Sequence, residues 1–266
     1  MPTLTTPQDL TLYYEQRGRG PDLLLIGGLS ADCSVWSFVV DALAENFRVT
    51  TFDNRGVGQS DAPAGPYTLQ MMADDTLALL DALQIPRTRV VGHSMGGAIL
   101  QLLCLEHPDR VARAVICASA ARVPLPSQQH VESVAQLREA GIAPELLALV
   151  TMPWIFGEAF LQDDARVVLA RAALLGNPRP QSIAAFRAQV AACIGTDLRR
   201  RLAAIHTPTL ILAGREDILT PVRCSEELHR GIREAQLTIL DDCAHMVQVE
   251  QPERFVALVT DFLRNA

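Results

Sequence analysis

Short apolar runs alternate with amphipathic stretches along most of the chain. Six runs have the composition of buried strands, at residues 23–26, 47–52, 89–91, 114–118, 209–213 and 237–240. Helical periodicity marks four stretches near them, at residues 69–83, 98–107, 222–232 and 252–263. Strands that alternate with helices favour a parallel sheet covered on both faces. The pattern therefore predicts an α/β fold with a mostly parallel, doubly wound sheet.

Two regions depart from this alternation. Residues 10–14 precede a glycine-rich turn at residues 18–21 and predict an edge strand pair at the start of the sheet. Residues 122–206 have helical periodicity and no convincing strand. Prolines would divide this region into about four short helices; they are Pro124, Pro126, Pro144, Pro153, Pro178 and Pro180.

The strand and helix pattern resumes at residue 207 with its earlier character. A helical cap inserted into one continuous sheet explains this better than a separate helical domain. We therefore predict a core of residues 1–121 and 207–266, with residues 122–206 as the cap.

Composition narrows the class of protein. The chain has 266 residues, of which 49% are hydrophobic and 20% charged, as is usual for a globular protein and not for a disordered one. The formal net charge of -7 gives no electrostatic reason to expect nucleic acid or an anionic membrane as a partner.

Targeting and redox signals are also absent. The amino terminus lacks the pattern of a signal peptide, and no apolar run reaches the roughly 18 residues of a membrane span, so we expect a cytoplasmic protein. The six cysteines have no C-x-x-C spacing and are expected as free thiols that pack like small apolar residues.

The sequence G-H-S-M-G at residues 92–96 follows a predicted strand and precedes a helical pattern. In that context G-x-S-x-G predicts a sharp turn that raises the serine Oγ above the sheet. The glycines at 92 and 96 let neighbouring backbone approach without a Cβ atom in the way. Ser94 is therefore the candidate nucleophile, and an ordinary glycine turn is the alternative.

A serine hydroxyl needs a base to remove its proton and an acid to orient that base. Among six histidines, His245 follows the last predicted strand, at the sheet edge where open α/β sheets carry their sites. The acid is expected at a strand end between the serine and the histidine. Asp217 meets this condition. The alternatives are Glu216, Asp241, Asp242, and a plain helix N-cap role for Asp217.

A tetrahedral intermediate needs two N–H donors aimed at its oxyanion. The Met95 amide follows the nucleophile directly, and the loop after residues 23–26 offers the Leu29 amide. The histidines have no metal-ligand spacing such as H-E-x-x-H, so neither a metal nor a cofactor is expected.

Taken together, these motifs resemble the α/β-hydrolase superfamily. Besides residues 92–97, the matching motifs are D-N-R-G-V-G-Q-S at 53–60, A-G-R-E-D at 213–217, A-H at 244–245 and E-Q-P-E-R-F at 250–255. The resemblance implies an α/β-hydrolase fold with a cap and a catalytic triad of Ser94, Asp217 and His245. One departure is that the usual His-Gly of the oxyanion loop is Gly27-Gly28 here.

Two groups within the superfamily share further features with this chain. The segments at 250–252 and 154–156 are similar to 3-oxoadipate enol-lactonases, whereas Gly27-Gly28 and residues 224–229 are similar to the proposed aminoacrylate hydrolase of pyrimidine breakdown. The resemblance separates the chain from dehalogenases and epoxide hydrolases, which have aspartate at the serine position. Met246 stands where carbon–carbon bond hydrolases tend to have tryptophan.

We therefore expect a hydrolase that cleaves a small carboxylic ester or lactone through an acyl-enzyme, of either catabolic type. A cofactor-free haloperoxidase or dioxygenase and a non-catalytic ligand receptor are the alternatives from other classes. The candidate substrate-binding residues are Trp154, Phe156 and Met246, with packing inside the cap as the alternative for the aromatic pair. A small molecule is the expected partner, without nucleic acid or membrane, and a homodimer is left open.

Overall fold

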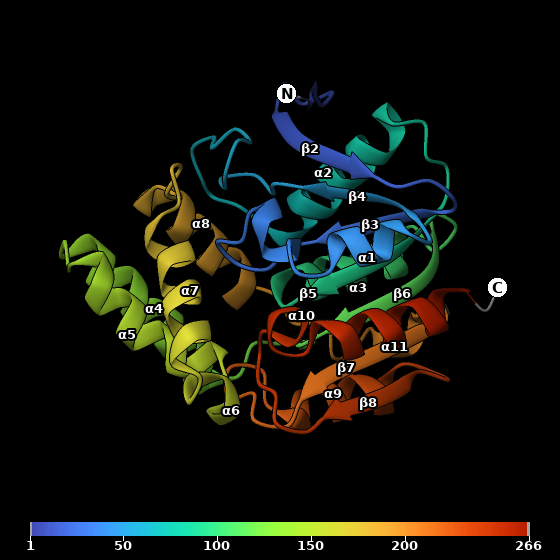
Figure 1. Ribbon diagram of the computed structural model, residues 1–266. Coiled ribbons are helices and arrows are strands. Elements are labelled where there is room, and N and C mark those ends of the chain that lie inside the picture. Colours follow the sequence, from blue (N-terminus) through green and yellow to red (C-terminus); the bar gives the residue numbers. More distant parts are fainter. Residues whose placement is uncertain (1, 265–266) are drawn as a thin grey trace.

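Eight strands form one sheet in the computed structural model, which describes residues 2–264 (Figure 1). Their order across the sheet is β1 (Thr3–Thr5), β2 (Thr11–Arg17), β4 (Arg48–Phe52), β3 (Asp22–Ile26), β5 (Thr88–His93), β6 (Val111–Cys117), β7 (Thr209–Gly214) and β8 (Gln236–Leu240). β2 pairs antiparallel with β1 and β4, and the other neighbouring pairs are parallel. The predicted mostly parallel sheet is confirmed. The predicted edge strand at residues 10–14 is present as β2, but its antiparallel partners are β1 and β4 rather than β3, which follows the turn at 18–21.

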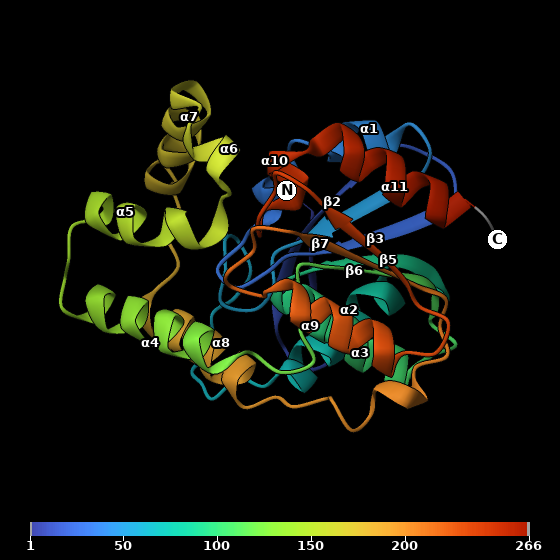
Figure 2. The same ribbon diagram turned by 90° about the horizontal axis from the view of Figure 1, so that it is seen from below.

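Helices cover both faces of the sheet (Figure 2). The helices α1 (Val40–Ala44) and α11 (Pro252–Arg264) lie on one face, and α2 (Leu69–Ala82), α3 (Met95–Glu106) and α9 (Val222–Gly231) lie on the other. In β3, Leu23 and Leu25 pack with the first group, whereas Leu24 and Ile26 pack with the second. Side chains alternate along a strand, so a continuous apolar run is what a strand buried on both faces requires.

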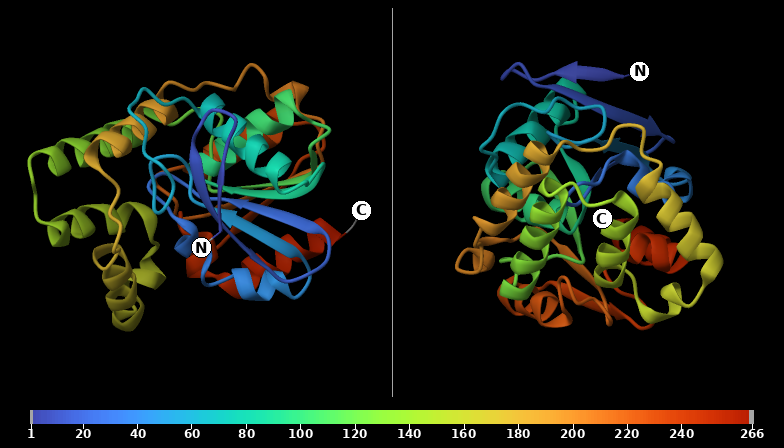
Figure 3. Two further views of the ribbon diagram at one scale, coloured as in Figure 1. Left: turned by 90° about the horizontal axis from the view of Figure 1, so that it is seen from above. Right: turned by 90° about the vertical axis from the view of Figure 1, so that its left-hand side faces the viewer.

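Five further helices lie between β6 and β7: α4 (Leu125–Glu139), α5 (Pro144–Ile155), α6 (Glu158–Leu161), α7 (Asp164–Leu175) and α8 (Ile183–Ile194). They form a layer beyond one end of the sheet, as two further views show (Figure 3). β5 and β6 end toward this layer, which places the cap helices over the carboxyl ends of the parallel strands.

The proline positions predict about four helices here, but Pro153 lies inside α5 rather than at its end. The ring removes a hydrogen bond to the carbonyl of Leu149, and both residues are exposed, so water can replace that bond. The predicted boundaries of the cap, 122 and 206, stay a prediction. Residues 1, 265 and 266 at the ends of the predicted core lie outside the described residues.

No helix within residues 2–264 is long and apolar enough to cross a membrane. All six cysteines are free thiols. Cys104, Cys117 and Cys243 are buried in the apolar clusters, and Cys224 is also buried. Cys33 and Cys193 are partly exposed.

A buried ion pair joins the loop after β4 to α2. Arg55 donates through Nε and Nη2 to the two carboxylate oxygens of Asp75, each at 2.6 Å, and both side chains are buried. Removing one partner leaves the other charge buried without compensation. Arg55 therefore has a structural role within the core.

We expect Asp75→Ala to lower the free energy of unfolding by about 3–5 kcal/mol, because the Arg55 guanidinium then loses its counter-charge in a buried site. Urea unfolding monitored by circular dichroism measures this change. Asp74→Ala is the matched control, since Asp74 is exposed and its carboxylate accepts a hydrogen bond from the exposed Gln70 rather than pairing with a buried charge. Equal stability of the two variants would contradict the expectation.

Candidate active site

Ser94 occupies the turn between β5 and α3. Its backbone has φ 55° and ψ -118°, a left-handed conformation that is strained for a residue with a side chain. Neighbouring glycines make the turn possible: a Cβ on Gly92 would lie 2.3 Å from the Gly96 oxygen, and one on Gly96 would lie 2.1 Å from the Ile26 oxygen. The Ser94 N–H donates to the Cys117 oxygen at 2.9 Å, which fixes the turn against β6.

His245 and Asp217 reach Ser94 from the loops after β8 and β7. The Nε2 of His245 lies 2.9 Å from Ser94 Oγ, and its Nδ1 lies 2.8 Å from Asp217 Oδ2. A carboxylate accepts hydrogen bonds but does not donate them, so Nδ1 carries the proton and Nε2 presents a lone pair to the serine hydroxyl. This arrangement can accept a proton from Ser94.

The Asp217 carboxylate is held by its own loop. Oδ1 accepts the N–H groups of Leu219 and Thr220, both at 2.8 Å, and Oδ2 accepts the Thr220 hydroxyl at 2.7 Å. Burial raises the pKa of Asp217, but the facing His245 and the Thr220 donors outweigh burial and leave this pKa below its ordinary value. The folded state thus gains stability from this group at neutral pH and loses it as the pH falls through the lowered pKa.

The alternative acids do not contact His245. Glu216 accepts the Glu158 N–H of the cap at 2.6 Å, and Asp241 pairs with Arg215 on the surface. His93, next to the serine in sequence, is buried behind it, and its Nε2 bonds to the His245 carbonyl at 2.9 Å. Burial, together with the nearby His245, lowers the pKa of His93 to about 3, so His93 stays neutral and serves as a donor to that carbonyl.

The two predicted oxyanion donors flank the same cavity. Leu29 and Met95 both line the hollow that contains Ser94, and neither backbone amide donates a hydrogen bond within residues 2–264. A Cβ on Gly28 would lie 3.0 Å from the Ser94 Cβ, so glycine lets the Leu29 loop approach the serine closely. These observations are compatible with the predicted role of the two amides.

The cavity beside Ser94 has a volume of about 70 Å³ and is mainly apolar. Besides Leu29 and Met95, its lining includes Ala98, Val131 and Leu219, and the one charged residue in it is Arg122. It is small and is closed partly by α4 of the cap.

The predicted substrate-binding residues do not line this cavity. Phe156 stacks on Phe160 with ring centroids 4.1 Å apart, and both belong to an apolar cluster against which Met246 packs. Trp154 stacks on His130 at 4.0 Å. In the structure, Trp154, Phe156 and Met246 therefore make packing contacts. The sequence could not show this, because an apolar pattern does not distinguish a pocket wall from the core of the cap.

Comparison with known proteins agrees with this fold. A family profile described as the alpha/beta hydrolase fold matches residues 21–252. The chain belongs to the α/β-hydrolase family. The resemblance seen in the sequence is thereby confirmed.

This α/β hydrolase has similar relatives along nearly its whole length. It is 31% identical to 3-oxoadipate enol-lactonase 2 of Acinetobacter baylyi, over 94% of this chain and 92% of that protein. It is also 31% identical to a protein named as a candidate carbamate hydrolase, RutD, of a Caulobacter species, over 95% of each chain. The solved enol-lactonase of Burkholderia xenovorans superposes with a TM-score of 0.87 at 28% identity, over 99% of this chain and 100% of that one. Family and relatives together support hydrolase activity.

Three residues of the hydrolase's site were missed by the sequence reasoning. Thr220 holds Asp217, as described above. Gln189 of α8 is fully buried; it donates to the Arg55 oxygen at 2.9 Å and accepts the Ser30 N–H, beside the Leu29 loop, at 3.0 Å. Glu250 accepts backbone N–H groups on both sides of His245. The Gln189 contacts join the cap to distant loops, which no local motif signals. Glu250 stands in the motif at 250–255, but the motif does not say which groups its carboxylate contacts.

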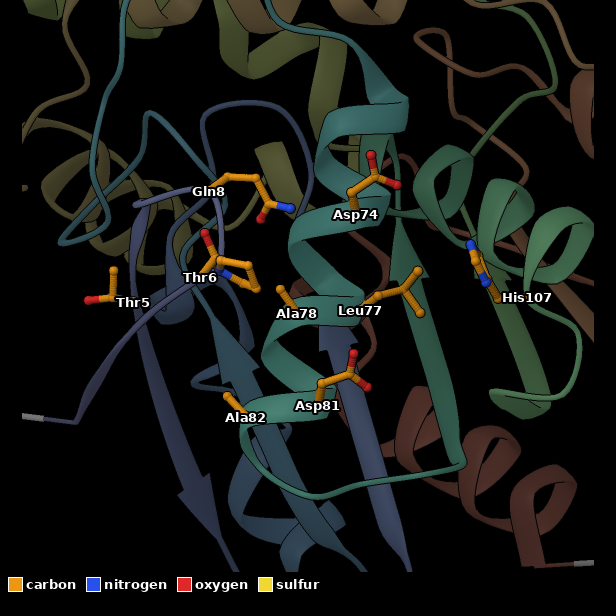
Figure 4. A pocket seen from close by; sticks show the side chains of 10 residues that line it. Thr5, Thr6, Gln8, Asp74, Leu77, Ala78, Asp81, Ala82 and His107 are labelled. Carbon is orange, nitrogen blue, oxygen red and sulfur yellow. The ribbon is translucent and has the colours of Figure 1, made fainter.

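A larger hollow of about 510 Å³ lies along α2 on the β1 side of the hydrolase (Figure 4). Thr6 and Gln8 face α2 there, and Asp81 of α2 is paired with Arg110 at 2.7 Å. It shares no lining residue with the Ser94 cavity. The volume of a cavity therefore does not identify the candidate active site here, because Ser94 and His245 meet at the smaller of the two cavities.

Proposed function

We propose that this hydrolase cleaves small carboxylic esters or lactones through an acyl-enzyme on Ser94. The observation that carries the proposal is the continuous contact from Ser94 Oγ to His245 Nε2 and from His245 Nδ1 to Asp217. Three side chains from the ends of three strands meet in the order needed for nucleophile, base and orienting acid. The enol-lactonase relatives support an ester or lactone bond as the target.

In the first half of the proposed reaction, His245 Nε2 takes the hydroxyl proton of Ser94 while Oγ attacks the carbonyl carbon. The carbonyl oxygen becomes an oxyanion facing the amides of Met95 and Leu29. The tetrahedral intermediate then expels the alcohol oxygen, which receives the proton from the His245 imidazolium. The products of this half are the acyl-enzyme and the free alcohol; in a lactone the alcohol stays attached to the acyl group.

In the second half, water replaces the alcohol. His245 Nε2 removes a proton from the water, whose oxygen attacks the acyl carbon, and the oxyanion forms again at the same amides. Collapse breaks the bond to Oγ, which takes the proton back and releases the carboxylic acid. Throughout, Asp217 keeps Nδ1 protonated and stabilises the imidazolium, which needs a carboxylate that stays ionised at neutral pH.

The cavity beside Ser94 sets the expected size of substrate. Its volume is about 70 Å³ and α4 borders it through Val131, so we expect it to favour a short acyl group. Its lining gives apolar contact to such a group. We expect longer acyl chains to require movement of α4, on which Val131 borders the cavity.

The proposal predicts a steep dependence of rate on acyl length. With p-nitrophenyl esters, kcat/KM is expected to fall at least about tenfold from the acetate to the octanoate. A methylene group that does not fit an apolar pocket costs about 1–3 kcal/mol of transition-state binding. Val131→Ala is expected to reduce this difference by enlarging the cavity. Val168→Ala on the exposed surface of α7 is the matched control and should keep the wild-type profile.

The same panel tests the reaction class by adding a γ-lactone and an aryl carbamate. Hydrolysis of acetate and lactone with little carbamate cleavage is the expected result. Turnover of the carbamate alone would contradict an ester or lactone enzyme and favour the chemistry named for the Caulobacter relative.

A further inference from the structure

Glu250 lies in the short helix α10 (Val247–Glu250), five residues after the proposed base, and its carboxylate is buried with 6% of the residue exposed. Oε1 accepts the N–H of Ala244 at 3.0 Å and the N–H of Met246 at 3.1 Å. These N–H groups belong to the residues on either side of His245, and Glu250 shares the Met246 N–H with the Ile155 carbonyl of α5, at 3.1 Å. A single carboxylate oxygen thus fixes the backbone that carries the imidazole.

A further backbone group of this segment is held from the other side. The carbonyl of His245 accepts a hydrogen bond from Nε2 of the buried, neutral His93 at 2.9 Å. Two N–H groups and one carbonyl of residues 244–246 are therefore held by two buried side chains. Backbone geometry that is determined this fully limits where the imidazole can lie.

The second oxygen of Glu250 reaches the cap. Oε2 accepts the N–H of Gly157, at the start of α6, at 2.8 Å. A Cβ on Gly157 would lie 3.2 Å from Glu250 Oε2 and 2.6 Å from Glu216 Oε2, so a side chain at this position would crowd both carboxylates. Arg166 of α7 adds hydrogen bonds to the carbonyls of Val249 and Glu250, each at 2.9 Å.

Burial raises the pKa of the Glu250 carboxyl, while the three N–H donors oppose this by favouring its charged form. No arginine, lysine or histidine side chain forms an ion pair with Glu250 within residues 2–264. The hydrogen-bond donors to this carboxylate are backbone N–H groups of the loop that carries His245 and of Gly157 in the cap. Glu250 therefore links this loop to the cap.

We propose that Glu250 is a positioning residue that holds the His245 segment in register with Ser94 and links it to the cap through Gly157. The inference rests on the proposed function, because it assigns Glu250 a role through His245 as the base. Glu250 acts through the backbone of its neighbours and touches neither the substrate nor the reacting atoms.

Glu250→Gln tests this role. A glutamine keeps one acceptor oxygen, but its NH₂ group cannot accept, so either the loop amides or the cap amide loses its partner. We expect kcat for p-nitrophenyl acetate to fall about 10–100-fold with KM changed less than about threefold, as displacement of a base by a fraction of an ångström predicts. The His245 Nδ1 proton, observed by low-field NMR, is expected to shift and broaden.

Glu216→Gln is the matched control. Glu216 holds the cap amide of Glu158 with its side chain but accepts no hydrogen bond from residues 244–246, so its kcat and NMR signal should stay within about twofold of wild type. If Glu250→Gln does not fold, Gly157→Ala, which keeps Glu250 but crowds its carboxylate, is measured in its place with the same expected loss of kcat.

The outcomes separate this inference from the proposed function. Suppose that the wild type turns over substrate and that kcat and the NMR signal are unchanged in Glu250→Gln, or in its substitute Gly157→Ala. This result would overturn the positioning role alone. An equal loss in the Glu216→Gln control would also overturn it, because the effect would then come from the cap contact rather than from the base's loop. Absence of turnover in wild type, with retention of the His245 signal shift in Glu250→Gln, would overturn the proposed function and leave the positioning role standing.

Discussion

Replacing Ser94 with alanine is expected to lower kcat/KM for p-nitrophenyl acetate by at least about 10⁴-fold, because the covalent route disappears and only binding and the oxyanion donors remain. The fold should persist, since the hydroxyl group of Ser94 is used only toward His245 among the described residues. Stopped-flow absorbance at the p-nitrophenolate band measures the loss, and it should also abolish any initial burst.

The control for this variant is Ser133→Ala, on the exposed side of α4, where the hydroxyl bonds to the Gln129 carbonyl. That change removes the same atom and should leave the rate within about twofold, as surface substitutions usually do. Retention of a burst in Ser94→Ala would mean that another group is acylated. Such a result would remove Ser94 from the mechanism.

Asp217→Asn is expected to lower kcat by about 10⁴-fold, the size of effect seen where an asparagine stabilises the wrong histidine tautomer. The amide nitrogen of asparagine donates, so His245 can turn its lone pair from Ser94 toward residue 217 and present an N–H to the serine instead. A base with a proton on Nε2 cannot take the hydroxyl proton. KM should change little, because Asp217 is fully buried behind the imidazole.

Asp241→Asn is the control for this second variant. Asp241 follows β8 at the same edge of the sheet, but it is exposed and paired with Arg215. Its rate should match wild type within about twofold. If Asp241→Asn and Asp217→Asn lost activity equally, the acid would act through general electrostatics and not through the contact with His245 Nδ1.

Much of the fold could be predicted because buried parallel strands leave a direct signal in the sequence. The run 23–26 is apolar at every position since Leu23 and Leu24 pack on opposite faces of the sheet. The strand β1 left no such signal, because its three residues at the sheet edge are mostly exposed. The sequence also could not predict that α5 continues through Pro153. This continuation depends on the solvent exposure of the helix turn before Pro153, where water can replace the missing hydrogen bond.

The sequence could predict those residues of the candidate site that follow the end of a predicted strand. Ser94, Asp217 and His245 could each be chosen by position, and the structure brings them into hydrogen-bond contact. The supporting contacts could not be read in this way. Glu250 reaches Gly157 across 93 positions and Gln189 reaches Ser30 across 159, so neither pair has a spacing that a motif could record.

Identification of the residue that is acylated during turnover shows directly whether Ser94 is the nucleophile. Wild-type protein is mixed with p-nitrophenyl acetate, quenched in acid within the burst, digested and analysed by mass spectrometry. The account predicts one acetyl group on the peptide that contains Ser94, and none on that peptide in Ser94→Ala. An acetyl group on a different residue that forms and decays at the turnover rate, or turnover with no acylated peptide, would contradict it.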